Sequence, residues 1–306
     1  MTPVAPPLPD PDPAVATRTV RLTDGRLLAY TEWGDPDGFP TFYFHGTPSS
    51  RLEGAFADQA AKRHGFRLIA VDRPGFGRST FQRGRTFRDW PVDVIALADA
   101  LGIETFGAVG HSGAGPHLFA CGSFCPPGRL AFLGALAPWG PLVDPGIRAG
   151  LNRLDQFYSS LARWAPWLVR ASFAPLGWGA RHAPGLFLVM LRTIVSPADR
   201  AMLADRRLAT HLRIAEAEAF RQGSRGGAYE AAMAYRSWGF DVASVCVPTH
   251  IRLGDEDAFV PREMGSYFER TIPGVDLKWV VGKGHFDVTG WDHILAACAP
   301  HRRIGG

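Results

Sequence analysis

The fold is decided by one stretch, Phe106-Gly107-Ala108-Val109-Gly110-His111-Ser112-Gly113-Ala114-Gly115. Its first residues are apolar and typical of a buried strand, and the pattern over 113–125 is typical of a helix. Between them, Ser112 has a small residue two positions away on each side, Gly110 and Ala114. A nucleophile on a tight strand-to-helix turn needs such neighbours, because the strained turn has no room for larger side chains. The pattern predicts that the Ser112 hydroxyl projects above the end of a strand.

The same stretch has a second interpretation, a glycine-rich turn that binds phosphate at the start of a helix. It does not match the spacing G-x-G-x-x-G, and it lacks the lysine of a P-loop. The helix N-terminus behind Ser112 would equally favour the oxyanion that develops when a serine attacks a carbonyl group. We favour the nucleophile, and on this segment alone the phosphate-binding turn stays as the alternative.

Strand-like and helical stretches alternate around this motif. A hairpin is predicted over 17–33, with its turn at Asp24-Gly25. Further strands are expected at 41–44, 67–71, 106–109, 130–135, 250–253 and 275–281, and helices at 51–64, 91–101, 113–125 and 287–299. Such alternation predicts an α/β fold, a mostly parallel twisted sheet with helices on both faces.

The alternation is interrupted over 142–241, where we find helical patterns and no convincing strand. One helix start is expected at Ser196, a side chain suited to an N-cap. We therefore predict an α/β core formed by 17–141 and 242–306, with 142–241 inserted as a helical cap or lid. Proline-rich residues 1–16 predict a disordered tail. The insertion also carries four tryptophans, most of which we expect to form its core: Trp164, Trp167, Trp178 and Trp238.

Three further segments follow predicted strands, where the active sites of open α/β sheets lie. His45-Gly46-Thr47-Pro48 allows close backbone approach at its glycine, and the Thr47 N–H can supply a second donor to an oxyanion. Gly254-Asp255-Glu256-Asp257 places acids just past a strand, and Lys283-Gly284-His285 places a histidine before the last helix. A nucleophilic serine needs a base that takes its proton and a carboxylate that orients the base. We interpret His45 and His111 as structural.

With Asp72-Arg73-Pro74-Gly75-Phe76-Gly77-Arg78-Ser79, these segments resemble the α/β-hydrolase superfamily, and specifically serine hydrolases with a helical cap domain. The resemblance covers about residues 17–141 and 242–300. It implies a catalytic triad and an oxyanion hole made by two backbone N–H groups: Ser112 as nucleophile, His285 as base and Asp257 as acid, with Thr47 and Gly113 as the donors.

Two details of the match carry weight. Asp257 is preferred to Asp255 because the family pattern places the acid three residues after the glycine, often shortly before a Val-Pro such as Val260-Pro261. Ala114 departs from the pattern, because the common elbow has glycine there. A methyl group is small enough for the turn to form.

The resemblance implies a serine hydrolase that cleaves an ester or similar acyl bond of a small molecule through an acyl-enzyme, without a cofactor. The same triad serves N-terminal aminopeptidases of the proline iminopeptidase type and other acyl-bond hydrolases, so the motif does not choose among them. An aminopeptidase would need acids of the insertion to hold a free amine, and Glu216, Glu218 and Glu230 are candidates. The alternative from another class is a catalytically silent ligand-binding protein of this fold.

Composition excludes several other classes. The chain has 306 residues, of which 46% are hydrophobic, and this excludes a wholly disordered protein. Its net charge is +4, but the basic residues are scattered, so we expect no nucleic-acid partner. No apolar run reaches the roughly 18–20 residues of a membrane span, and the four cysteines form neither a disulfide framework nor a metal site. We expect a cytoplasmic protein without a metal; the sequence does not predict its oligomeric state.

Overall fold

The computed structural model of the protein describes residues 16–302, apart from the side chains at positions 163, 166 and 170. The predicted disordered tail lies, except for Ala16, outside the described residues. The strands are β1 (Arg18–Arg21), β2 (Leu27–Gly34), β3 (Phe39–Phe44), β4 (Phe66–Val71), β5 (Phe106–His111), β6 (Leu130–Leu136), β7 (Thr249–Gly254) and β8 (Asp276–Val280).

These strands form one sheet in the order β1-β2-β4-β3-β5-β6-β7-β8. The β1–β2 and β2–β4 pairs are antiparallel, and every other neighbouring pair is parallel. The predicted, mostly parallel sheet is therefore confirmed. Phe44 is in register with Val71 of β4 and with Gly110 of β5. Because these strands end together, the loops that follow them begin side by side at one edge of the sheet.

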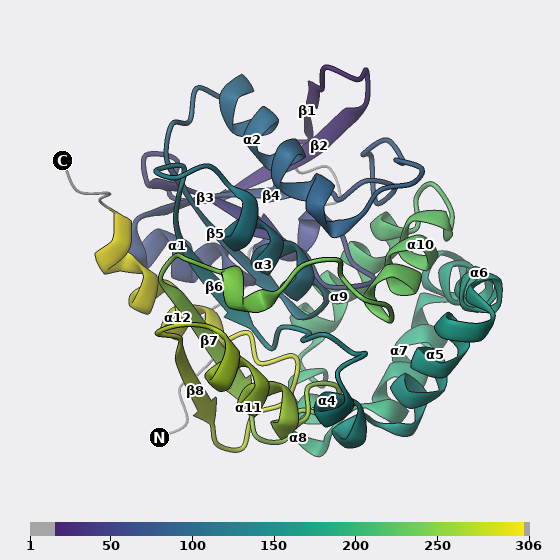
Figure 1. The fold of residues 1–306 in the computed structure, drawn as a ribbon. Coiled ribbons are helices and arrows are strands. Elements are labelled where there is room, and N and C mark those ends of the chain that lie inside the picture. Colours follow the sequence, from purple (N-terminus) through teal and green to yellow (C-terminus); the bar gives the residue numbers. More distant parts are fainter. Residues whose placement is uncertain (1–15, 303–306) are drawn as a thin grey trace.

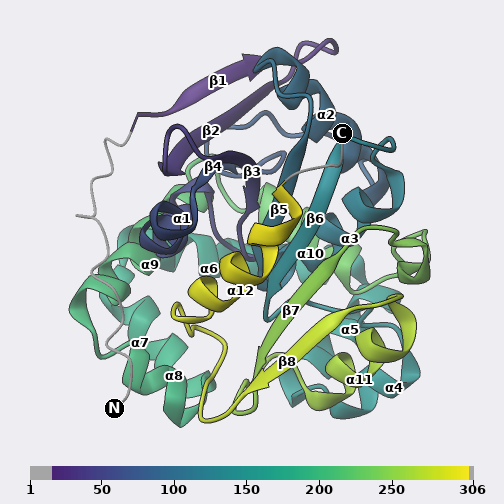
Figure 2. The same cartoon turned by 90° about the vertical axis from the view of Figure 1, so that its left-hand side faces the viewer.

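Helices cover both faces of the sheet, as predicted. Figure 2 shows α1 (Asp58–His64) and α12 (Gly290–Cys298) across the face that is turned to the viewer. The other face is covered by α2 (Trp90–Ala100), α3 (Gly115–Phe124) and α11 (Arg262–Thr271). Neighbouring residues of a strand point to opposite faces, so Phe42 and Phe44 belong to one buried core and Tyr43 to the other.

Two predicted helices are divided in the structure. The stretch expected over 51–64 is a 3₁₀ helix, η1 (Arg51–Ala57), followed by α1. The stretch expected over 113–125 begins with a 3₁₀ turn, η3 (Ser112–Ala114), and continues as α3. Short 3₁₀ helices also occur as η2 (Phe87–Asp89), η4 (Val242–Ser244) and η5 (Ala299–Arg302). The sequence periodicity located these segments but did not distinguish the tighter helix.

Between β6 and β7 the chain forms helices, and residues 142–241 contain no strand. Figure 1 shows α5, α6 and α7 together, away from β8 and α12. Ser196 caps α8, because its side chain accepts a hydrogen bond from the Asp199 backbone N–H. The helices are α4 (Pro145–Gly150), α5 (Arg153–Trp164), α6 (Pro166–His182), α7 (Pro184–Ile194), α8 (Pro197–Met202), α9 (Arg206–Ala219) and α10 (Arg225–Ala234).

The prediction that most tryptophans of this segment form a core is wrong. Trp238 is buried, but Trp164, Trp167 and Trp178 are 78%, 65% and 62% exposed. For Trp178 the physical reason is that α6 and α7 line a large cavity instead of a closed core, and this side chain is one of the lining residues. Nothing in the structure explains the exposure of Trp164 and Trp167. Among residues 16–302, no helix combines the length and the hydropathy needed to cross a lipid bilayer.

Candidate active site

Ser112 lies at the turn between β5 and η3, as the sequence predicts. Its φ of 54° is in the left-handed region, which costs a non-glycine residue about 1–3 kcal/mol. An added Cβ at Gly110 would lie only 2.7 Å from the Ala114 Cβ and 2.8 Å from the Phe44 carbonyl oxygen. Because the Ala114 methyl group and the Phe44 backbone both lie this close, position 110 has no room for a side chain.

The structure brings Ser112, His285 and Asp257 together, although the serine and the histidine are 173 residues apart. The Ser112 Oγ lies 2.8 Å from His285 Nε2. His285 Nδ1 lies 2.8 Å from Asp257 Oδ2. In the neutral imidazole with its proton on Nδ1, the Nδ1–H donates a hydrogen bond to the carboxylate. Nε2 is then free to accept a hydrogen bond from the Ser112 hydroxyl. All three side chains are buried.

The Asp257 carboxylate is held by the loop that carries it. Its Oδ1 accepts hydrogen bonds from the backbone N–H groups of Phe259, at 2.7 Å, and Val260, at 2.9 Å. This leaves Oδ2 directed to His285. Asp255, the other acid of the segment, instead accepts a hydrogen bond from the Gly282 N–H at 2.7 Å. The two acids therefore make different contacts, and of the two only Asp257 is bonded to the histidine.

Two opposing effects set the pKa of His285. Burial lowers the pKa, but the charge of Asp257 and its hydrogen bond outweigh burial, so that the pKa lies above the ordinary 6.5. The nearby charges of Asp199 and Glu53 act in the same direction. An imidazole with a raised pKa accepts a proton more readily, provided that it begins neutral.

The loop after β3 approaches the serine turn closely. An added Cβ at Gly113 would lie 3.1 Å from the Thr47 backbone nitrogen and 2.6 Å from the Thr47 Cβ. Glycine is therefore required at 113 to bring the two backbone segments together. An added Cβ at Gly46 would lie 3.5 Å from the Ser112 Cβ. The backbone N–H groups predicted as oxyanion donors, those of Thr47 and Gly113, thus lie on two adjacent segments beside the Ser112 side chain.

Glu53 of η1 fixes the backbone of this loop, a role that the sequence did not reveal. Both of its carboxylate oxygens lie 3.0 Å from the Gly46 nitrogen, and the Tyr43 hydroxyl donates to Oε1 at 2.9 Å. His111 Nδ1 lies 3.3 Å from the same oxygen. Burial alone raises the pKa of Glu53, but the hydrogen bond and charge of His111 lower it to about 2.

The two histidines interpreted as structural are both placed by backbone contacts. His111 donates from Nε2 to the carbonyl oxygen of His285 at 3.0 Å, and the two rings are 4.8 Å apart. His45 Nδ1 lies 2.7 Å from the Gly46 carbonyl oxygen, and the Arg73 N–H donates to His45 Nε2 at 3.3 Å. Burial and the charge of Arg73 lower the pKa of His45 to about 3, which favours the neutral ring.

A buried charge network lies directly behind Thr47. Glu230 of α10 accepts a 2.6 Å hydrogen bond from the Thr47 hydroxyl and pairs with Arg73 at 2.5 Å and with Arg85 at 2.9 Å. Arg73 also donates to the Thr47 hydroxyl and to the carbonyl oxygens of residues 45 and 46. Burial raises the pKa of Glu230, but Arg73 and His117 outweigh it and hold this pKa well below its ordinary value. Glu230 is therefore an ionised carboxylate at neutral pH.

Other side chains of the 142–241 segment hold the remaining loops. Asp199 accepts a 2.8 Å hydrogen bond from the Phe286 N–H, next to the histidine. Asn152 donates to the Ala258 carbonyl oxygen at 3.1 Å, next to the acid. Arg51 bridges Asp72 of the sheet edge, at 2.7 Å, and Glu218 of α9, at 2.9 Å. The inserted helices thus contact every loop that contributes a predicted site residue after β3, β7 and β8.

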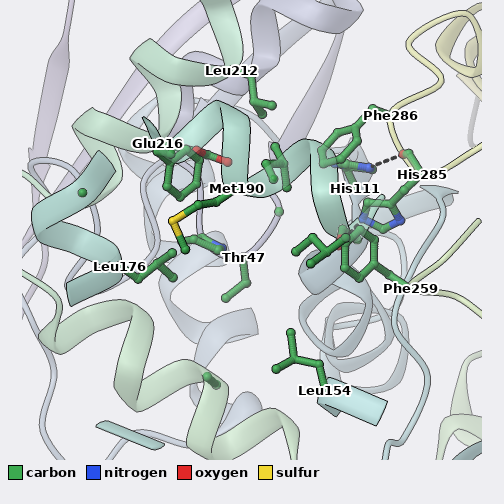
Figure 3. Close-up of a pocket in the computed structure, with 18 of the residues that line it drawn as sticks. Thr47, His111, Leu154, Leu176, Met190, Leu212, Glu216, Phe259, His285 and Phe286 are labelled. Atoms are coloured by element: carbon green, nitrogen blue, oxygen red, sulfur yellow. Dashed lines mark hydrogen bonds between the residues drawn. The ribbon is translucent and has the colours of Figure 1, made fainter. Parts of the chain in front are cut away.

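A cavity of about 740 Å³ opens in front of Ser112 and His285. Figure 3 shows the His111–His285 hydrogen bond on one side of this cavity. Trp139, which follows β6, also lines it. Most of the other lining side chains are apolar and come from the inserted helices and the loops after β7 and β8, among them Leu154, Leu176, Leu186, Met190, Leu212, Phe259 and Phe286.

Comparison with known proteins gives the same fold. A family model described as alpha/beta hydrolase fold matches residues 42–289. A non-heme chloroperoxidase from Streptomyces lividans is 35% identical over 114 residues, which make up 37% of this chain and 41% of that protein. A bifunctional esterase/perhydrolase from Acinetobacter calcoaceticus is 35% identical over 97 residues, 31% of this chain and 35% of that protein. The structure of an esterase from Thermogutta terrifontis superimposes with a TM-score of 0.65 at 21% identity, over 91% of this chain and 93% of that one.

The chain belongs to the alpha/beta hydrolase fold family, because the family model matches most of its length. The predicted resemblance is therefore confirmed. The aligned stretches span only about two fifths or less of the two relatives, and the structural likeness at 21% identity concerns the fold. One fold hosts many reactions, so the reaction must be argued from the site.

Replacing Glu230 tests the buried network. Glu230→Gln keeps an acceptor for Thr47 but leaves the buried guanidinium groups of Arg73 and Arg85 without their counter-ion. Breaking a buried ion pair in this way costs about 3–5 kcal/mol, so we expect a loss of that size in the free energy of unfolding, measured by urea denaturation at pH 7. Glu269→Gln, at an exposed position of α11, is the control and should change stability by no more than about 0.5 kcal/mol. If the two variants had the same free energy of unfolding, the buried network would not contribute to stability as proposed.

Proposed function

We propose that the protein is a serine hydrolase that cleaves an ester or similar acyl bond of a small-molecule substrate. Ser112 is the nucleophile, His285 the base and Asp257 the acid. The observation that carries this proposal is the continuous chain of two 2.8 Å hydrogen bonds from carboxylate to imidazole to hydroxyl, at the wall of a large apolar cavity. Such a chain has the geometry that acyl transfer by a serine requires.

The reaction proceeds in two balanced halves. His285 takes the proton of the Ser112 hydroxyl while Oγ forms a bond to the carbonyl carbon, and the carbonyl electron pair moves to the oxygen. As the tetrahedral intermediate collapses, the bond to the leaving group breaks and His285 returns the proton to it. In the second half, His285 takes a proton from a water molecule while the water oxygen forms a bond to the acyl carbon. The bond between that carbon and Ser112 Oγ then breaks, His285 returns the proton to Oγ, and the carboxylic acid is released. Asp257 stabilises the imidazolium in both halves and keeps Nδ1 as the proton-bearing nitrogen.

The oxyanion is assigned to the backbone N–H groups of Thr47 and Gly113. Two observations support this assignment. The two backbone segments approach each other closely beside Ser112. Polar contacts from Glu53, Arg73 and Glu230 also fix the Thr47 loop. Donors that are positioned before the reaction stabilise developing charge without reorganising during it. Removal of one such donor commonly costs about 10²–10³ in kcat.

We propose further that 142–241 forms a cap over a core of 17–141 and 242–306. Its helices supply most of the apolar wall of the cavity, which suits an apolar acyl group. Its partly buried hydrogen bonds to the loops that carry Thr47, Asp257 and His285 favour a cap that frames the site. Substrate choice would then depend on the side chains of this segment.

An ester is favoured over a peptide with a free N-terminus. Of the three acids considered for binding an amine, Glu230 is paired with two arginines and Glu218 is paired with Arg51 and Arg221. Of these three acids, Glu216 alone is among the described residues that line the cavity. An ammonium group would need an ionised, accessible carboxylate, and the two acids that are ionised are already neutralised.

Replacing the serine tests the proposal directly. Ser112→Ala should abolish labelling by a fluorophosphonate probe and lower the hydrolysis of p-nitrophenyl esters at least about 10³–10⁴-fold, because the nucleophile is absent. Ser123→Ala is the matched control, since Ser123 only donates to a backbone carbonyl within α3. A folded wild-type protein that neither takes the label nor hydrolyses any ester of the panel would instead be a silent ligand-binding protein.

The two neighbouring acids give a second test. Asp257→Asn should reduce ester turnover by about 10³–10⁴-fold, because the amide no longer fixes the tautomer of His285 or stabilises its charged form. Asp255→Asn should leave turnover within a few-fold of wild type, since Asp255 only accepts from the Gly282 N–H. Steady-state kinetics on one ester compares the two variants, and the opposite ranking would assign the acid to Asp255.

The pH dependence of kcat/KM gives a third test. His285 must be neutral to accept the serine proton, so activity should fall as the pH decreases through its pKa. Since Asp257 raises this pKa above 6.5, the acidic limb of the profile should have its midpoint above 6.5. In Asp257→Asn the raising charge is lost while burial remains, so the residual activity should show an acidic limb at lower pH. A limb that does not move would show that another group controls it.

A further inference from the structure

Glu216 is a buried acid that the proposed mechanism does not use. It lies on α9, its residue is only 5% exposed, and it lines the cavity in front of Ser112. Within the part of the chain that the structure describes, its Oε2 has no hydrogen-bond partner. Figure 3 shows its carboxyl group among the side chains that line the cavity, which also include Leu212 and Met190.

This isolation distinguishes Glu216 from the other buried acids around the site. Glu53, Asp155 and Glu230 each have partners within 3.0 Å. A buried polar group without a partner costs about 1–3 kcal/mol, so such a group in a native protein calls for an explanation. A ligand in the cavity that supplies the missing partner accounts for this cost.

The surroundings decide which kind of partner fits. Burial, and secondly the charge of Glu53, raise the pKa of Glu216 well above 4.5, which favours the uncharged acid. An uncharged carboxyl group has one O–H donor and retains acceptor capacity. No lysine or arginine occurs among the described residues that line the cavity, so none of these residues offers a permanent positive charge to an anionic ligand. An ammonium ion would have to lose its hydration among mainly apolar side chains.

The position of Glu216 indicates which part of a substrate it meets. In Figure 3 it lies with Leu176 and Met190 on one side of the cavity, while His285, Phe259 and Phe286 lie on the other. In the proposed reaction His285 protonates the leaving group, so the leaving group lies on the histidine side. The side chain of Glu216 therefore faces the acyl group.

Building on the proposed hydrolase function, we propose that Glu216 is a specificity-determining residue that binds an uncharged oxygen group of the substrate's acyl chain. The substrate class is an ester whose acyl chain is apolar apart from one hydroxyl or carbonyl group at a distance from the scissile bond. The carboxyl O–H donates to that oxygen, and the carboxyl oxygens accept from a hydroxyl. No covalent step is involved.

The experiment compares pairs of p-nitrophenyl esters with straight acyl chains of four to ten carbons, with and without a terminal hydroxyl group. At the best-fitting length, wild-type protein should have a kcat/KM about tenfold higher for the hydroxylated ester, the worth of one net hydrogen bond. Glu216→Leu should lose this preference, so that the two esters of a pair have equal kcat/KM. Glu216→Gln should keep most of it, because an amide also donates and accepts.

Two controls separate polarity from shape and from charge. Leu212→Met alters the same wall of the cavity one helical turn away without changing its polarity, so the preference should survive. Esters with a terminal ammonium group test the alternative ligand. If wild type prefers the ammonium ester and Glu216→Gln abolishes that preference, the ligand is a cation and the proposal for an uncharged oxygen is wrong. An equal rate for all pairs in wild type would also overturn it.

Binding to the inactive protein keeps the inference independent of turnover. Calorimetry on Ser112→Ala should give about tenfold tighter binding of methyl 6-hydroxyhexanoate than of methyl hexanoate, or the same difference at whichever chain length fits best. The difference should vanish in the double variant Ser112→Ala/Glu216→Leu. If the protein binds the hydroxylated ester selectively but wild type has no esterase activity, the proposed hydrolase function is wrong and the Glu216 site stands. If wild type hydrolyses esters without preferring the hydroxylated ones, the hydrolase function stands and the proposed role of Glu216 is wrong.

Discussion

The buried pairing of Glu230 with Arg73 determines how the two parts of the chain meet at the site. Arg73 lies in the loop after β4 and contacts the backbone of the loop after β3, whereas Glu230 belongs to α10 of the inserted helices. Charged groups that are removed from water require one another, because either one alone would be left uncompensated. The Thr47 hydroxyl bonds to both partners. The Thr47 loop beside Ser112 is consequently held by a side chain that lies 183 residues after Thr47 in the chain.

The same principle recurs wherever the inserted helices contact a loop of the sheet edge. Asp199 reaches the backbone beside His285, and Asn152 reaches the backbone beside Asp257. These contacts are made by α8, by α10 and by the residue that caps α5. In contrast, α7 has no buried residue, although it contributes to the apolar cavity wall. The segment thus combines anchored elements, which carry the polar contacts, with a more exposed helix that contacts the cavity chiefly through apolar side chains.

Features that depend on residues close together in the chain, such as turns and strands, could be predicted from the sequence. The turn at Ser112 could be predicted because Gly110 and Ala114 stand beside it, and the strands because apolar runs alternate with helical ones. The side chains of Glu53, Asp199 and Glu230 could not be assigned, since the groups that they bind lie on other segments and leave no local pattern. The position of Trp178 could not be predicted for a related reason: a large apolar residue suits the wall of a cavity as well as a core, and periodicity does not distinguish the two.

Glu53 and Glu216 show how position alone separates two identical side chains. Both are buried in the wall of one cavity, and burial raises the pKa of each. Glu53 receives hydrogen bonds from Gly46 and Tyr43 and lies against His111, so its charged form is stabilised and it serves the backbone. Glu216 has no such donor at Oε2, and the charge of Glu53 disfavours its ionisation further. The ionised acid that holds the loop after β3 therefore helps to keep the second acid neutral.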